Sequence, residues 1–404
     1  MSERKTFYFD NNATTRVAPE VVEAMLPFLR DFWGNPSSAY SFGSQVAKRI
    51  EEAREKIAAM IGADPKEIIF TSCATESNNA AIQSALATHP AKRHILTTSV
   101  EHSAIIKHCE WLQKQGVEVT FLPVDADGML DLHLLDQSIR PDTALVSVMW
   151  ANNETGVVFP VEEVAAICRS RGVPFHTDAT QVPGKLKMDL GEVGADFLAL
   201  SGHKLHAPKG VGLLYVRKRT KFQPYVIGGH QERGKRGGTE NVASIIGFGK
   251  AAELAVSRLE DENTRVRALR DRLENTILRT VPNTVRNGAK EPRLPNTSNI
   301  AFDFVEAEGI LMKLDDLGIC ASSGSACTTG SLNPSHVLTA MGIKPARAKG
   351  CVRFSLGFYS TDEEVDYLLS HIGDVIGRLR DASPEKPARH GKHATNLTSL
   401  LGTP

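Results

Sequence analysis

Residues 161–204 read VEEVAAICRSRGVPFHTDATQVPGKLKMDLGEVGADFLALSGHK, and this stretch decides the fold class. Val161–Arg171 has apolar residues at the i, i+3, i+4 spacing of an amphipathic helix, whereas Val173–Thr177 and Phe197–Leu200 are short apolar runs typical of buried strands. The same strand pattern occurs at Glu67–Thr71, His94–Thr98, Val117–Leu122, Ala144–Met149 and Gly212–Val216. Buried strands that alternate with helices favour a mostly parallel sheet with helices on both faces. We therefore predict an α/β fold.

The sequence pattern changes after about residue 240. A long charged helix is predicted over Ala251–Thr280, and mixed helix and strand segments interrupted by Pro and Gly follow it. This change predicts a domain boundary near residues 255–260. Residues Ser383–Pro404 are rich in Pro, His, Lys and Thr with little apolar periodicity, so we expect a poorly ordered tail.

Charge and cysteine content exclude several classes of protein. Lys and Arg total 47, and Asp and Glu also total 47, so no excess of positive charge favours nucleic acid or an anionic membrane. No run approaches the roughly 18 apolar residues of a membrane span, and the first residues lack an apolar signal core, so we expect a cytoplasmic protein. The six cysteines form no CxxC pair and no zinc-spaced cluster, which disfavours a disulfide scaffold or an intrinsic metal site.

Two residues at the ends of predicted strands indicate a cofactor. Lys204 closely follows the strand that ends near Leu200, where burial would make its amine a nucleophile toward aldehydes. Asp178 follows the strand Val173–Thr177, where a carboxylate would keep the ring nitrogen of pyridoxal phosphate protonated. An isolated lysine is usually a surface charge, and a lone Asp178 fits a helix cap equally well. The two residues together favour a pyridoxal phosphate site.

Two further strand ends fit the same site. Thr71–Glu76 joins a strand to a helix, and the backbone amides of that helix start, with the Thr75 hydroxyl, would hold a phosphate. The Ser, Thr and Glu residues there equally resemble an ordinary helix cap. No GxxxxGK[ST] or GxGxxG motif occurs, which disfavours nucleotide binding. His102 lies just beyond the strand His94–Thr98, where its imidazole would stack on a flat cofactor and exchange protons.

A series of segments resembles, in order, the motifs of one enzyme family. These segments are Asp10–Thr15, Ala74–Ser77, Glu101-His102, Ala151–Glu154, His176–Gln181, His203-Lys204, Gly237–Asn241, Ser322–Cys327, Asn333–Leu338 and Arg353–Gly357. Through them, residues 6–380 resemble the cysteine desulfurases of the NifS/IscS family, in the class-V aminotransferase group.

The resemblance implies a fold-type I, pyridoxal 5'-phosphate-dependent transferase that works as a homodimer with active sites near the subunit interface. Such an enzyme converts L-cysteine to L-alanine and leaves the sulfur as a persulfide on an enzyme cysteine. The expected parts are an N-terminal arm associated with the small domain over residues 1–15, a large cofactor-binding domain over 16–258, a small α+β domain with the catalytic cysteine loop over 259–382, and a polar tail over 383–404.

The family's functional residues carry over to matching positions of this sequence. The residues that would perform the chemistry are Lys204, which would bind the cofactor covalently, Cys327 and His102. Those that would bind the cofactor are Asp178 at the ring nitrogen, Gln181 at the ring oxygen, Asn153, and Ala74, Thr75, Ser201 and His203 at the phosphate, with Thr239 from the partner subunit. Those that would receive the substrate carboxylate are Arg353 and Asn153, with help from Asn12.

The segment around Cys327 indicates a sulfur acceptor. Ala321–Asn333 holds six Ser or Thr residues and two Gly, so we expect a loop that moves between the cofactor and an outside acceptor. The other five cysteines are predicted to be core residues, and His102 would exchange protons with the sulfurs. We expect no intrinsic metal, although Cys327 could transiently ligate an iron–sulfur cluster.

The expected partner is an iron–sulfur scaffold protein, because the long Ser-rich loop resembles the family members that hand sulfur directly to a scaffold. Segments 71–77, 151–156 and 228–233 resemble the nitrogen-fixation type more than the housekeeping type, which suggests sulfur supply for nitrogenase maturation.

Several alternatives share parts of this pattern. A housekeeping desulfurase has the same chemistry. An aminotransferase, a selenocysteine lyase or a kynureninase-like hydrolase would share the fold and the cofactor, but none of them needs a covalent sulfur acceptor such as Cys327. A non-catalytic sulfur carrier is disfavoured because Lys204 and Asp178 are both present.

Overall fold

The computed structural model describes residues 5–323 and 334–383. Its centre is a seven-stranded sheet of order β2-β8-β7-β6-β5-β3-β4, in which β8 runs antiparallel to its neighbours β2 and β7 and the other pairs are parallel. The strands are β2 (Ile68–Thr71), β3 (His94–Thr98), β4 (Glu118–Leu122), β5 (Thr143–Ser147), β6 (Phe175–Asp178), β7 (Phe197–Ser201) and β8 (Gly212–Val216). The predicted α/β class with a mostly parallel sheet is confirmed.

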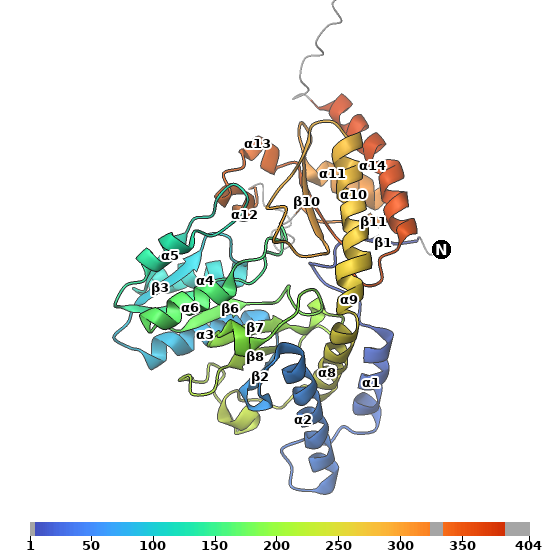
Figure 1. Cartoon of the computed structure of the whole chain (residues 1–404). Helices are drawn as coiled ribbons and strands as arrows, with labels where there is room; N and C mark the ends of the chain where they lie inside the picture. Colours follow the sequence, from blue (N-terminus) through green and yellow to red (C-terminus); the bar gives the residue numbers. More distant parts are fainter. Residues whose placement is uncertain (1–4, 324–333, 384–404) are drawn as a thin grey trace, which may run out of the picture.

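Helices surround this sheet (Figure 1). They are α1 (Pro19–Arg30), α2 (Ser41–Ile61), α3 (Ala74–Thr88), α4 (Ser103–Lys114), α5 (Leu132–Ser138), α6 (Val161–Arg171), α7 (Leu190–Val193) and α8 (Val242–Ser257), with short 3-10 turns η1 (Pro65–Glu67), η2 (Gly202–Lys204) and η3 (Gln231–Gly234). Alternate strand residues face opposite sides: Ile95 and Leu145 pack with α3 and α4, whereas their neighbours Leu96 and Val146 pack in a cluster with α2, α6 and α8. This two-sided burial explains the continuous apolar runs of the sequence.

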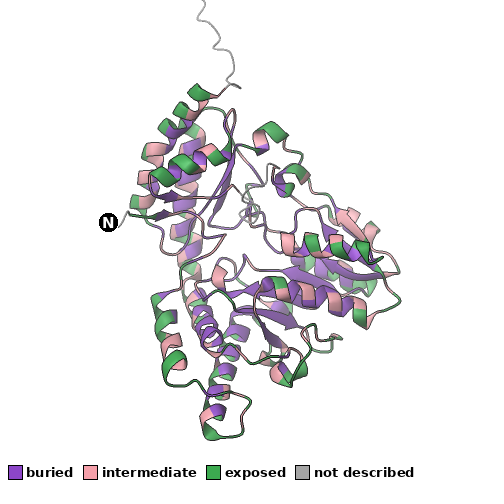
Figure 2. Ribbon diagram, turned by 180° about the vertical axis from the view of Figure 1, so that it is seen from behind, coloured by how far each residue is buried: buried purple, intermediate pink, exposed green. Residues whose placement is uncertain are grey.

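The remaining described residues build two smaller sheets and a separate hydrophobic core. The elements are β1 (Phe7–Tyr8), α9 (Leu259–Asp261), the π-helical turn η4 (Glu262–Val266), α10 (Arg267–Thr280), β9 (Thr284–Arg286), β10 (Thr297–Phe302), α11 (Ala307–Asp316), β11 (Ile319–Cys320), α12 (His336–Ala340), α13 (Pro345–Ala348), β12 (Cys351–Ser355) and α14 (Asp362–Ala382). β10 pairs antiparallel with β9 and β12, and β1 pairs in parallel with β11. Phe7 and Phe9 therefore share a core with α10, α11 and α14, far from them in sequence. Buried residues concentrate on the strands and inner helix faces of both parts (Figure 2).

The prediction of one helix over residues 251–280 is wrong. In the structure α8 begins earlier, at Val242, and ends at Ser257, and Arg258 has φ −99° and ψ −2°. The π-helical turn Glu262–Val266 then changes the helical register before α10 begins at Arg267. Periodicity alone does not reveal such a register change. No helix within residues 5–323 and 334–383 has the length and apolar character needed to cross a membrane.

Candidate active site

A cavity of about 270 Å³ lies at the carboxyl ends of β3, β5, β6 and β7 and at the start of α3. Ligands of open α/β sheets bind at this edge. The predicted site residues that line the cavity are Asn12, Ala74, Thr75, His102, Asn153, Asp178, Gln181, Ser201, His203, Lys204 and Arg353. Thr239 is exposed and does not line this cavity, and Cys327 lies outside the described residues.

Lys204 ends the short turn η2, directly after β7, and reaches across to the N-terminal segment. Its Nζ donates to the backbone carbonyl oxygens of Asn12 at 2.5 Å and Ala13 at 2.7 Å. A lysine amine in the carboxyl-end crevice of a sheet is placed to react with an aldehyde.

Asp178 is the last residue of β6, and its carboxylate is held on both oxygens. Oδ2 accepts from Asn78 Nδ2 at 2.7 Å, and Oδ1 accepts from the backbone N–H of Thr180 at 3.0 Å. The helix-cap alternative does not fit the described residues, because the next helix begins at Leu190 and is capped by Asp189. Sequence reasoning missed Asn78, which lies one turn after Thr75 on α3 and therefore faces the sheet.

His102 is the N-cap of α4, where its Nδ1 accepts from the backbone N–H of Ala104 at 3.2 Å. Because Nδ1 is the acceptor, the neutral imidazole carries its hydrogen on Nε2. Burial lowers the pKa of His102, and the nearby negative charge of Asp178 opposes this only in part. The imidazole is therefore mainly neutral at pH 7 and able to give or take a proton.

The start of α3 presents uncapped backbone amides. Its N-cap residue, Cys73, makes no side-chain capping bond, and the Glu76 side chain instead accepts from the Ser72 N–H and pairs with Arg236 at 2.9 Å. The amides of Ala74 and Thr75 are thus left for an anion, which disfavours the ordinary-cap alternative.

Ser201, the last residue of β7, and His203, on the turn η2, also line the cavity. Ser201 ends β7 beside Gly212, and His203 Nδ1 lies 3.1 Å from the Thr14 hydroxyl. Burial, assisted by the positive charge of Lys204, lowers the pKa of His203 to about 4, so its ring is neutral at pH 7.

Arg353, on β12, is almost fully buried beside Asn153. Its Nη1 donates to the backbone carbonyl of Asn153 at 2.9 Å, and its Nη2 pairs with Asp10 Oδ1 at 2.6 Å. Burial raises the pKa of Asp10, although the Arg353 charge opposes this. The side-chain amide of Asn153 makes no hydrogen bond to any residue that the structure describes. Both groups suit an incoming carboxylate.

Asn12 uses its side chain differently from the expectation of direct carboxylate binding. Its Nδ2 donates to Asn153 O at 3.1 Å and to Thr297 Oγ1 at 2.8 Å, and its Oδ1 accepts from Asn296 Nδ2 at 3.0 Å. Both amide hydrogens are therefore occupied, and its backbone carbonyl serves Lys204 and Gln181 instead. The local geometry gives Asn12 a positioning role.

Glu101 lies beneath the cavity and was not assigned a role from the sequence. Its Oε1 accepts from the Thr98 hydroxyl and from the Met149 N–H, each at 2.9 Å, so it joins the ends of β3 and β5. Burial raises the pKa of Glu101 to about 8, so its carboxyl is mainly neutral at pH 7. In the sequence, the position of Glu101 directly before His102 was the feature that could have pointed to a role for it.

The donor set of the cavity fits pyridoxal phosphate. The uncapped α3 amides suit its phosphate, the fixed Asp178 carboxylate suits a protonated ring nitrogen, and the Lys204 amine suits its aldehyde. The buried Thr180 hydroxyl at the cavity has no hydrogen-bond partner among the described residues, which indicates room for a polar ligand atom.

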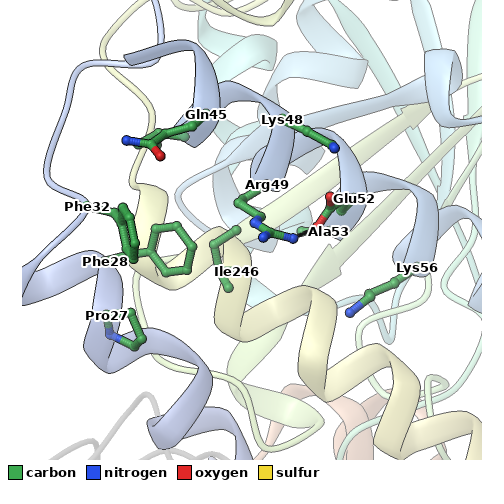
Figure 3. A pocket seen from close by; sticks show the side chains of 11 residues that line it. Pro27, Phe28, Phe32, Gln45, Lys48, Arg49, Glu52, Ala53, Lys56 and Ile246 are labelled. Atoms are coloured by element: carbon green, nitrogen blue, oxygen red, sulfur yellow. Dashed lines mark hydrogen bonds and ion pairs between the residues drawn. The ribbon is translucent and has the colours of Figure 1, made fainter. Parts of the chain in front are cut away.

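A larger hollow of about 590 Å³ lies elsewhere, between α1, α2 and α8 (Figure 3). Phe28, Phe32 and Ile246 form its apolar side, and the exposed ion pair Arg49–Glu52 lies on its rim. It offers neither a strand-end lysine nor a buried carboxylate, so we place the chemistry in the smaller cavity.

Comparisons with known proteins identify the family of this chain. The family model described as Aminotransferase class-V matches residues 7–368. The chain is 55% identical to cysteine desulfurase 2 of Trichormus variabilis over 377 residues, which cover 93% of this chain and 94% of the relative. It is 53% identical to cysteine desulfurase NifS of Azotobacter vinelandii over 378 residues, with 93% and 94% covered.

Solved structures also resemble this fold. A NifS-like protein matches with a TM-score of 0.88 and 39% identity, covering 93% of this chain and 100% of that chain. SspA in complex with cysteine matches with a TM-score of 0.79 and 37% identity, covering 88% and 100%.

Proposed function

Because the chain belongs to the cysteine desulfurases of the class-V aminotransferase family, which use pyridoxal 5'-phosphate, we propose specific roles for its residues and a specific destination for its sulfur. The sulfur of L-cysteine passes to Cys327 as a persulfide, and from there to an iron–sulfur scaffold protein for nitrogenase maturation. The observation that carries this proposal is that Lys204 and Asp178 share one cavity with Arg353.

Lys204 would bind the cofactor, Asp178 would pair with its ring nitrogen, and Gln181 would donate to its ring oxygen. The amides of Ala74 and Thr75, with Ser201 and His203, would hold its phosphate. When bound, the cofactor withdraws electrons from the substrate, which weakens the Cα–H bond and then the Cβ–Sγ bond. Asn78 keeps the Asp178 carboxylate in place through its 2.7 Å hydrogen bond.

Arg353 and Asn153 hold the substrate carboxylate. Asp10 already fixes one side of the Arg353 guanidinium, so the arginine stays oriented before substrate arrives. The Lys204 amine takes the proton from Cα. His102, neutral and with its hydrogen on Nε2, exchanges protons with the sulfurs.

The transfer to Cys327 balances without an outside oxidant or reductant. The Cβ–Sγ bond of cysteine breaks, an S–S bond forms at Cys327, and the former Cβ gains a proton. L-cysteine and one thiol thus become L-alanine and one persulfide. Burial raises the pKa of the Cys109, Cys168 and Cys351 thiols to about 12, so they are poor nucleophiles near pH 7 and do not compete.

We also propose a homodimer, because Thr239 is exposed and does not line the cavity of its own chain. In the dimer its hydroxyl reaches the cofactor phosphate in the partner subunit. The similarity to NifS, together with the sequence motifs, supports the nitrogen-fixation role over the housekeeping role.

A steady-state assay tests the reaction at Cys327. L-cysteine is added to the holoenzyme and alanine release is measured for the wild type, Cys327→Ala and the control Cys168→Ala, a buried cysteine of α6. We expect alanine release to be lost in Cys327→Ala and retained in Cys168→Ala. Full activity of Cys327→Ala would refute Cys327 as the acceptor.

A growth experiment tests the biological role. The gene replaces the desulfurase gene of the nitrogen-fixation cluster in a nitrogen-fixing bacterium, and growth on N2 is compared with growth on ammonium. We expect growth on N2 to be restored. Rescue of a housekeeping desulfurase mutant without restored growth on N2 would favour the housekeeping alternative.

A further inference from the structure

Lys185 is a buried lysine that the proposed reaction does not use. It lies just after the turn at Gly184, and 5% of its surface is exposed. Its Nζ donates to Gln181 twice, to the backbone carbonyl oxygen at 3.1 Å and to the side-chain Oε1 at 3.2 Å. Lysines are seldom buried so deeply without a specific partner, and here that partner lines the cofactor cavity.

The contacts of Gln181 fix the direction of its amide. A lysine ammonium only donates, so it selects Oε1, and the carbonyl of Asn12 only accepts, so it selects Nε2, which it meets at 3.0 Å. The two neighbours therefore enforce the same orientation. These contacts use one N–H of Gln181 Nε2 and leave the other unused. Because Gln181 lines the cavity, this second N–H is available to a ligand there.

Gln181 and Lys204 also share an acceptor. The Asn12 carbonyl that accepts from Gln181 accepts from Lys204 Nζ at 2.5 Å. A chain of hydrogen bonds thus runs from Lys185 through Gln181 and Asn12 to the lysine that binds the cofactor.

Glu262 accompanies Lys185 in the interior. It lies on the π-helical turn η4, and π-helical turns are frequent at functional sites. Its buried Oε2 has no hydrogen-bond partner among the described residues, and it lines a cavity of about 30 Å³ together with Lys185 and Lys204. The next residue, Asn263, donates through Nδ2 to the Lys185 backbone carbonyl at 2.8 Å.

Among the charges around Lys185, that of Glu262 favours its protonated form and those of the neighbouring cations oppose it. Burial lowers the pKa of Lys185 to about 8 and raises that of Glu262 to about 7, and their mutual attraction opposes both shifts. The positive charge of Arg353 on β12 lowers the pKa of Lys185 further. Arg258 and His206 line the same small cavity, as does Lys204. Lys185 is therefore mainly an ammonium at pH 7, a group that only donates.

We propose that Lys185 is a positioning residue, which holds the Gln181 amide with an N–H directed at the ring oxygen of the cofactor, and that Glu262 retains Lys185 in this place. The inference rests on the proposed role of Gln181. A donor at the ring oxygen stabilises the deprotonated form of the cofactor–Lys204 chromophore more than the protonated form. Without an oriented Gln181, the chromophore titrates at a higher pH.

A pH titration of the visible absorption band of the holoenzyme tests this. We expect Lys185→Met to shift the midpoint upward by about one pH unit. A shift of this size corresponds to the free energy of about one hydrogen bond to a charged group. Gln181→Ala should shift it in the same direction, and the double variant should shift no further than Gln181→Ala. Lys187→Met, which removes an exposed lysine two residues away, is the matched control and should titrate like the wild type.

The outcomes separate this inference from the proposed function. If the wild type shows the band but Lys185→Met titrates at the same pH, the positioning role is overturned while the proposed function stands. The same conclusion follows if the pH shifts of Lys185→Met and Gln181→Ala add up in the double variant. A wild type that shows neither the band nor alanine release would refute the proposed function. If Lys185→Met does not fold, Lys185→Met/Glu262→Gln removes the buried pair together, and the same upward shift is expected.

Discussion

The buried carboxyl of Glu101 makes the stability of the folded state depend on pH. Glu101 is fully buried, with hydrogen bonds to Thr98 and Met149, and its pKa is raised to about 8. The folded state therefore binds a proton that the unfolded chain loses near pH 4.5. The resulting stabilisation is fully present below pH 4.5 and is lost as the pH rises through 8.

Replacing Glu101 with Gln, which stays neutral, should remove this dependence. Relative to the wild type, we expect Glu101→Gln to gain up to about 1.4 kcal/mol of unfolding free energy for each pH unit between 5 and 8. Urea unfolding at several pH values measures it. Glu110→Gln, at a half-exposed carboxylate of α4, is the control. A constant difference between Glu101→Gln and the wild type across this range would contradict the burial argument.

The residues that could be predicted without the family resemblance share one property, which is that they lie at the ends of strands. Lys204, Asp178 and His102 could be placed because the carboxyl ends of parallel strands meet at one edge. Asn78 and Lys185 could not, because their roles depend on one hydrogen-bond partner each and on burial. No local pattern distinguishes such residues from ordinary polar side chains.

At the scale of elements, the start of α3 packs against the end of β7 and the start of β8, and we propose that the phosphate binds at this corner. Gly212 begins β8 and packs directly on this corner. A Cβ on Gly212 would lie 2.7 Å from Leu200 O and 2.8 Å from Cys73 Cα, closer than real contacts allow. The backbone on both sides of the cradle would have to move.

Gly212→Ala should therefore weaken cofactor binding. We expect the dissociation constant of pyridoxal phosphate to rise at least about tenfold, since losing a hydrogen bond to a charged group costs roughly 1.5–3 kcal/mol. Fluorescence titration of the apoenzyme measures it. Gly377→Ala on α14, where a Cβ meets nothing within 4 Å, should leave the affinity unchanged. Equal affinities of Gly212→Ala and the wild type would contradict this account of the cradle.

Element boundaries were predictable where the apolar pattern was continuous. β3, β8 and α6 have the limits that their patterns predict. The run Ala144–Met149 predicts a strand that extends past the observed β5 (Thr143–Ser147), because Val148 and Met149 remain buried after leaving the strand. An apolar run indicates which residues are buried, but it does not indicate where their pairing with the neighbouring strands ends.

At the scale of the molecule, the described residues form three hydrophobic cores, one on each face of the large sheet and one around α10, α11 and α14, and the N-terminal β1 belongs to the last of these. Segment Asp10–Ala13 connects this core to the cavity through Arg353 and Lys204. The division into a large domain over 16–258 and a small domain over 259–382, with an arm over 1–15, remains our proposal. The pairing of β1 with β11 lay beyond sequence reasoning, because two residues carry too little pattern.

Hybrid dimers test the proposed exchange of Thr239 between subunits. A Lys204→Ala chain paired with a Thr239→Ala chain should keep one site with wild-type cofactor affinity, because the intact lysine then meets the intact threonine of its partner. A Lys204→Ala/Thr239→Ala chain paired with a wild-type chain should bind the cofactor about tenfold more weakly. Cofactor titration of purified hybrids measures both, and the reverse order would place Thr239 in its own subunit's site.

We propose above all that sulfur from cysteine reaches Cys327 at the site built around Lys204. Intact-mass spectrometry of the holoenzyme after one turnover with L-cysteine, followed by peptide mapping, tests it directly. We predict one added sulfur atom per active site, located on Cys327, with one alanine formed and no added sulfur in Lys204→Ala. Sulfur located mainly on Cys73, Cys109, Cys168, Cys320 or Cys351 would contradict it.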